Sequence, residues 1–127
     1  MLQFWYLSSK DALTLHPNNS TYDFTVELLE TIKGKFSCAL VDFSCAGAIT
    51  EELYIFSDIL ENSSVHDHAL PLLRIVSQTG EVRLPHYKPL SRQVIQRVRI
   101  YIRTKEFKVP SSDIGPVRCV LSVLPLK

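Results

Sequence analysis

The sequence predicts an all-β fold formed by one domain. Three observations support this prediction. Apolar and polar residues alternate with a period of two along most of the chain, helical periodicity is weak, and the seven prolines fall mostly between the alternating runs. A chain of 127 residues can bury a real core, and its 46% apolar and 21% charged residues are ordinary for a globular protein. We therefore expect a single domain over residues 1–127.

The first half of the chain contains four expected strands. Phe4–Leu7 is an aromatic run, and Tyr22–Leu28 alternates apolar with polar residues as a half-buried strand does. Phe36–Phe43 carries apolar residues on both sides, so we expect a strand covered on both faces or lying at a subunit contact. Leu53–Asp58 is a further strong strand candidate.

The second half supplies four more expected strands. Leu72–Ser77 is a strong candidate and Glu81–Leu84 a short one. Arg97–Arg103 shows the cleanest alternation in the sequence, and Val117–Val123 closes the series. Eight short strands without Asn-Gly hairpin turns favour a β-sandwich with longer Greek-key connections, and the eight-stranded jelly roll is its natural form.

Composition and charge argue against several classes of protein. A net charge of +1 creates no global field that would attract nucleic acid or an anionic membrane. No run approaches the roughly 18–20 apolar residues of a membrane helix, and Met1–Leu7 lacks the basic region and cleavage site of a signal peptide. The cysteines, Cys38, Cys45 and Cys119, are odd in number and show no CxxC spacing, which fits a reduced intracellular chain.

Motifs for catalysis or metal binding are weak. His66-Asp67-His68 contains good zinc ligands, but a closed site needs about four converging ligands, so a polar loop is the better interpretation. Glu51-Glu52 and the dispersed Asp58, Glu61 and Asp67 could form an acid–base pair, yet carboxylates of this kind usually solvate loops or cap strand ends. We therefore expect no metal, no cofactor and no enzymatic activity.

The best candidate for a functional surface is a row of side chains on one face of a strand: Arg97, Arg99, Tyr101 and Arg103. Three cations on one face repel each other unless anions oppose them. A subunit contact would supply carboxylates of a neighbour, and packaged nucleic acid would supply phosphates. A solvated face, or pairing within the chain with residues such as Asp23 and Glu27, is the plainer alternative.

Aromatic residues provide a second set of candidate contacts. Phe4-Trp5-Tyr6 places three aromatics in a row, and a strand with such residues is covered on both faces either by its own fold or by a neighbour. Aromatic residues are enriched in the cores of interfaces. We therefore include Trp5 and Phe43 among the candidate subunit contacts, with Glu61–His68 as a loop at the rim.

Several segments occur in an order that matches a known family. They are Phe4–Leu7 followed by Ser8-Ser9 and His16–Thr21, then Leu53–Ile59 with Glu61, then Pro71–Val76, and finally Tyr87, Pro89-Leu90 and Arg97–Arg103. In this order the chain resembles the minor capsid, or penton-type, protein of Polinton/Maverick elements and adintovirus-like viruses. Two departures stand out. Only Ala46–Glu52 occupies the place of a long insertion in that family, and Leu124–Lys127 replaces its ending of histidine, aromatic residue and arginine.

The resemblance implies a structural role. It implies a single jelly roll that self-assembles, with a pentamer at the capsid vertices beside a major capsid protein as the expected form. The expected location is the virion, with assembly inside the host cell, in the nucleus. Neither a membrane nor a specific nucleic acid is an expected partner. The alternative is a small β-sandwich binding module, derived from a host or accessory, that binds a ligand such as nucleic acid and has no capsid role.

Overall fold

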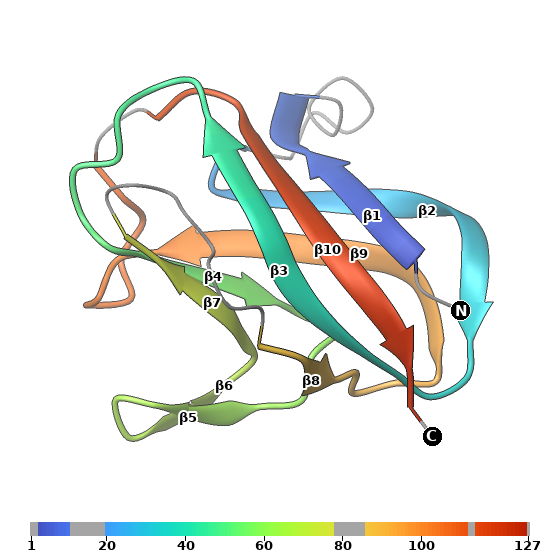
Figure 1. Ribbon diagram of the computed structural model, residues 1–127. Helices are drawn as coiled ribbons and strands as arrows, with labels where there is room; N and C mark the ends of the chain where they lie inside the picture. Colours follow the sequence, from blue (N-terminus) through green and yellow to red (C-terminus); the bar gives the residue numbers. More distant parts are fainter. Residues whose placement is uncertain (1–2, 11–19, 78–85, 112–113, 127) are drawn as a thin grey trace.

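The chain forms two antiparallel four-stranded sheets that pack face to face as a sandwich (Figure 1). The computed structural model describes residues 3–10, 20–77, 86–111 and 114–126. In spatial order, the first sheet contains β1 (Gln3–Ser8), β10 (Val117–Pro125), β3 (Phe36–Cys45) and β8 (Lys88–Pro89). The second sheet contains β2 (Asp23–Lys33), β9 (Val94–Arg103), β4 (Leu53–Ser57) and β7 (Leu72–Val76). A separate hairpin joins β5 (Ser63–Val65) to β6 (His68–Leu70).

The strands of the two sheets pair in a nested order. The first strand pairs with the last, β1 with β10, and the second with the last but one, β2 with β9. Further in, β3 pairs with β8 and β4 pairs with β7. Because partners come from distant parts of the sequence, each sheet requires the two halves of the chain to meet.

Every expected strand but one coincides with an observed strand. The exception, Glu81–Leu84, lies outside the described residues. The expectation of eight strands is corrected, because the described residues form ten. The additional ones are the β5–β6 hairpin and the two-residue strand β8, which are too short and too polar to produce a visible alternation.

The core lies between the sheets and is built from the apolar side of each alternating strand. In β9, Val98, Ile100 and Ile102 are fully buried. Phe24 of β2 and Ile55 of β4 join them in one continuous cluster. Burial of each such side chain contributes about 1.5–3 kcal/mol. The period-two pattern read from the sequence is therefore the pattern of the core.

The three cysteines are free thiols. Burial raises the pKa of Cys38 and of Cys119 to about 12, so both remain protonated and unreactive at neutral pH. Cys45 is only partly buried at the end of β3, and its thiol donates to the carbonyl oxygen of Gly47 at 3.2 Å. Within the described residues, no helix combines the length and the apolar character that spanning a bilayer requires.

This arrangement predicts selective thiol labelling. In native buffer at pH 8, an aromatic disulfide reagent should react with Cys45 much faster than with Cys38 or Cys119, although burial also raises the pKa of Cys45, and it should react with all three cysteines in denaturant. The measurement is the absorbance of the released thiolate with time. A Cys45→Ser variant should show no rapid native reaction; rapid labelling of that variant would contradict the burial of Cys38 and Cys119.

Candidate functional site

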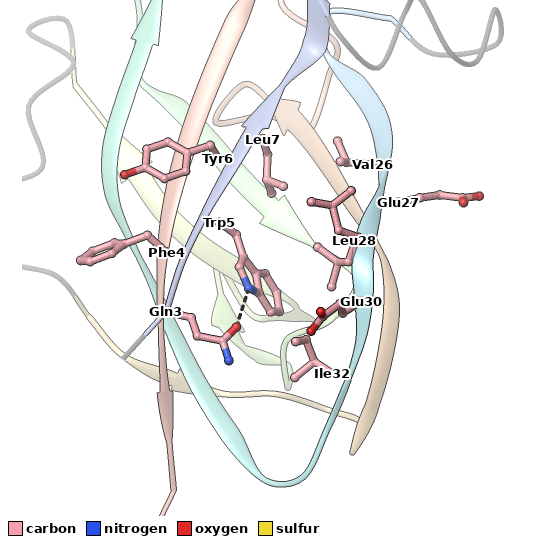
Figure 2. Close-up of a pocket in the computed structure, with 11 residues that line it drawn as sticks. Gln3, Phe4, Trp5, Tyr6, Leu7, Val26, Glu27, Leu28, Glu30 and Ile32 are labelled. Atoms are coloured by element: carbon pink, nitrogen blue, oxygen red, sulfur yellow. Dashed lines mark hydrogen bonds between the residues drawn. The ribbon is translucent and has the colours of Figure 1, made fainter. Parts of the chain in front are cut away.

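An open side of the sandwich carries an apolar groove between β1 and β2, which we call the edge groove (Figure 2). β1 is an edge strand of the first sheet and β2 an edge strand of the second. The groove has a volume of about 430 Å³. Its apolar lining comes from Trp5, Leu7, Val26, Leu28 and Ile32.

The groove is open because β2 leaves its partner over part of its length. β2 pairs with β9 up to Glu27 and again from Ile32, and the register shifts between these two points. Such a bulge bends a strand and redirects its side chains. Leu29, inside the irregular segment, is fully exposed to solvent.

The polar groups of the edge groove are few. The indole N–H of Trp5 donates to the side-chain oxygen of Gln3 at 3.3 Å. Glu30 also lines the groove and brings a negative charge to its β2 side, whereas Glu27 points away from it (Figure 2). A groove of this kind can receive an apolar side chain, with a cation beside it.

Two of the predicted contact residues lie in the core of the single chain. These residues are Trp5 and Phe43, which are only 8% and 4% exposed. The exposed aromatics of β1 are instead its alternate residues, Phe4 at 49% and Tyr6 at 70%. Figure 2 shows these two pointing away from the edge groove while Trp5 points into it. Phe4 and Tyr6 are therefore the β1 aromatics that another molecule can contact.

The predicted arginine–tyrosine row (Arg97, Arg99, Tyr101 and Arg103) lies on β9, opposite β2. Arg99 forms two hydrogen bonds with Asp23, from Nε to Oδ1 at 2.9 Å and from Nη2 to Oδ2 at 2.7 Å. Arg103 Nη2 lies 3.8 Å from Asp23 Oδ2. Arg97 Nε lies 3.2 Å from Glu27 Oε1. The alternative of pairing within the chain is thus the arrangement observed.

The strand register explains these ion pairs. Glu27 is directly opposite Arg97, and Asp23 is opposite Tyr101, so its carboxylate reaches the arginines on both sides of the tyrosine. The hydrogen bond from Arg99 holds the pKa of Asp23 below its ordinary value, although burial opposes this. The row is therefore largely neutralised before any partner arrives.

Tyr101 holds the centre of the row. The Arg99 and Arg103 guanidinium carbons lie 4.6 and 5.3 Å from its ring centroid, within the range of a cation–π interaction. Directly opposite Tyr101 on the neighbouring strand β4, the ring of Phe56 is stacked against it, with 5.1 Å between the ring centroids. These contacts fix Tyr101 and both guanidinium groups in one arrangement.

The predicted rim loop, Glu61–His68, lies beside this row. It contains β5 and the turn of the β5–β6 hairpin, and the two turn residues, His66 and Asp67, have positive φ angles of 46° and 68°, as a type I′ turn requires. His66 Nε2 lies 2.8 Å from the hydroxyl oxygen of Tyr54. The His68 ring packs edge-on against Phe107 at 5.4 Å. The histidines therefore anchor the hairpin, and no cluster of three metal-ligating side chains occurs among the described residues.

A shallow hollow of about 370 Å³ separates the hairpin from the row. Its wall includes Phe56, Tyr101, Arg103, His68 and Phe107. Sequence reasoning missed Phe107, because a single aromatic in a polar loop shows no periodicity. Its positive φ of 63° is an unusual backbone conformation for such a residue, and only the structure reveals it.

Comparison with known proteins adds no family to this description. No protein-family model matches the sequence, and no curated protein matches it either.

The ion pair at Asp23 predicts a dependence of stability on pH. Since the folded-state pKa of Asp23 is depressed, its stabilisation is present above its unfolded pKa of about 3.9 and is lost as pH falls through the lower folded value. Asp23→Asn should lower the free energy of unfolding by about 1 kcal/mol at pH 7, because the pair is partly exposed. The loss should shrink below pH 4. Urea unfolding across pH measures both quantities.

Asp42→Asn is the matched control. Asp42 lies 3.5 Å from Arg118 in a more exposed pair on the first sheet, so its replacement should change stability by less than Asp23→Asn does. Equal effects of the two substitutions at every pH would contradict a special role for the Asp23 pair.

Proposed function

We propose that this chain is a structural capsid subunit with a single jelly-roll fold, and that it assembles with copies of itself. The supporting observation is the nested pairing of strands. A jelly roll arises when a long antiparallel hairpin wraps into a sandwich, so that its first strand pairs with its last and each further pair follows inward. With β5–β6 as an inserted hairpin, the pairs β1–β10, β2–β9, β3–β8 and β4–β7 follow this rule.

The assembly surface in this proposal is the side of the sandwich that carries the edge groove. Strands β1 and β2 each have one edge without a neighbouring strand in their sheet, and exposed edges promote association. Phe4, Tyr6 and Leu29 place exposed apolar side chains around the same edges. A second copy of the chain is the occupant that would cover these groups.

Ring closure requires that one patch of the subunit meets a different patch on the next copy. The arginine–tyrosine row with the β5–β6 hairpin provides a second patch. Its pre-formed ion pairs would present a rigid surface, with Tyr101 as an aromatic anchor. The remaining parts of the proposal rest on the resemblance alone. In these parts, the subunits form a pentamer at the capsid vertices, beside a major capsid protein, and assemble in the host nucleus. No catalytic step is assigned to the chain.

The alternative, a nucleic-acid binding module, receives less support from this row. Nucleic acid binding depends on cations that are free to replace counterions at phosphates. Here Asp23 and Glu27 already oppose the arginines. An affinity for single-stranded DNA that fell steeply with salt would favour the alternative.

Light scattering across protein concentration tests the proposal. We expect a discrete oligomer, in the simplest case a pentamer, that dissociates on dilution. A second measurement, by native mass spectrometry, would give the number of copies. A strict monomer at every concentration, by both methods, would contradict self-assembly.

Leu29→Gln tests the surface itself. Because Leu29 is fully exposed in the monomer, we expect the substitution to change the free energy of unfolding of the monomer by less than about 0.5 kcal/mol. The association constant should fall at least tenfold, since the substitution removes an apolar contact at the proposed interface. Ile75→Gln, also at an exposed apolar residue but on β7 at the opposite edge of the sandwich, should leave association unchanged. Equal association of both variants and the wild type would exclude the edge groove as the interface.

A further inference from the structure

A second pocket opens at the other side of the sandwich, where the edge strands are β7 and β8. It has a volume of about 240 Å³. Its lining combines three apolar residues with three that carry or can carry positive charge: Leu72, Leu73, Ile75, Arg74, His86 and Lys88. We call this the cationic pocket.

Arg74 is the exceptional arginine of the described residues. The other five, at positions 92, 97, 99, 103 and 118, each lie within 4 Å of a carboxylate oxygen. No such ion pair between described residues includes Arg74. Its Nη1 is buried and has no hydrogen-bond partner. An unsatisfied buried donor of a charged group is costly, so a missing acceptor is indicated at this place.

Lys88 brings a second cation to the same pocket. Its ammonium group donates to the carbonyl oxygen of Leu72 at 2.6 Å and lies 3.5 Å from Ser63 Oγ. Burial, and then the nearby charge of Arg74, lower the pKa of Lys88. The ion pairs between described residues include neither Lys88 nor His86. Among the described residues, the pocket therefore gathers positive charge without carboxylates paired to it as they are on β9.

We infer that the cationic pocket binds a phosphate-type oxyanion, either free or as the terminal phosphoryl group of a larger molecule. A tetrahedral oxyanion offers several acceptor oxygens, which suit the fork of a guanidinium and the donors of an ammonium. An anion in the pocket would lie beside Arg74 and Lys88, which both line it, and would relieve the repulsion between their charges. The pocket is large enough for such an anion and too small for a nucleic-acid strand.

The bound anion would also stabilise the fold. Arg74 comes from β7 in the second sheet and Lys88 from β8 in the first. An anion between them links the two sheets at their open edge. This inference does not rest on the proposed capsid function, because binding takes place within one chain.

Thermal unfolding tests the inference. The transition temperature should rise with inorganic phosphate, compared with sodium chloride at the same ionic strength and pH, since a ligand that binds the native state stabilises it. Arg74→Gln and Lys88→Gln should each weaken phosphate binding at least tenfold. Arg118→Gln, on the outer face of the first sheet, should respond as the wild type does. Equal responses of all four proteins would overturn the inference, because the anion would then act without this pocket.

His86→Gln keeps the test decisive if the other variants fail to fold, because His86 is exposed and its replacement should be tolerated. Phosphate titration followed by amide NMR should shift signals of residues around β7 and β8 in the wild type, with at least threefold weaker affinity in His86→Gln. Unchanged affinity and shifts elsewhere would overturn the proposed location.

Two further ligands separate the sources of the anion. If a nucleoside monophosphate competes with phosphate and binds more tightly, the ligand is a terminal phosphoryl group of a larger molecule. If the nucleoside monophosphate does not compete with phosphate, the ligand is the free anion. Equally tight binding of the nucleoside without its phosphate would contradict recognition of an oxyanion.

Discussion

Strand β9 lies between β2 and β4, and its register determines both the core and the outer surface of the second sheet. Side chains of a strand alternate between faces, so a shift of one residue would exchange the two sets. In the observed register, Val98, Ile100 and Ile102 fill the core and the arginines face outward. The same register brings Asp23 and Glu27 of β2 to those arginines. Core packing and charge neutralisation therefore depend on one alignment.

The surface of this protein is distinguished by where its charged side chains lie and how they are paired, and not by its net charge. The net charge is +1, yet the two sides of the sandwich differ. On β9 the cations oppose carboxylates across the strand pair, and the result is a rigid and nearly neutral face. At β7 and β8, Arg74 and Lys88 approach each other without such partners among the described residues. The cation row visible in the sequence is thus paired within the chain, whereas Arg74 and Lys88 form no ion pair among the described residues.

The open edges of the sandwich carry the features that the monomer leaves unsatisfied. Two sheets of four strands have edges on both sides, at β1 with β2 and at β8 with β7. The first side exposes apolar groups around the edge groove, and the second carries the partly buried cations Arg74 and Lys88 in a pocket. Self-association would relieve the first and an oxyanion the second, by different physical forces. The two proposals can therefore succeed or fail separately.

The sequence by itself determined the all-β class and the position of most strands, because period-two alternation is a local property that burial enforces. It also anticipated that Asp23 and Glu27 were possible partners of the arginines. Only the tertiary structure decided which side of β1 faces inward, so Trp5 moved from a candidate contact to the core. The short β5–β6 hairpin, Phe107 and the meeting of Arg74 with Lys88 likewise left no local signal. The hairpin is local but too short and polar to show an alternation, whereas the positions of Phe107, Arg74 and Lys88 depend on contacts between distant segments, which local patterns do not specify.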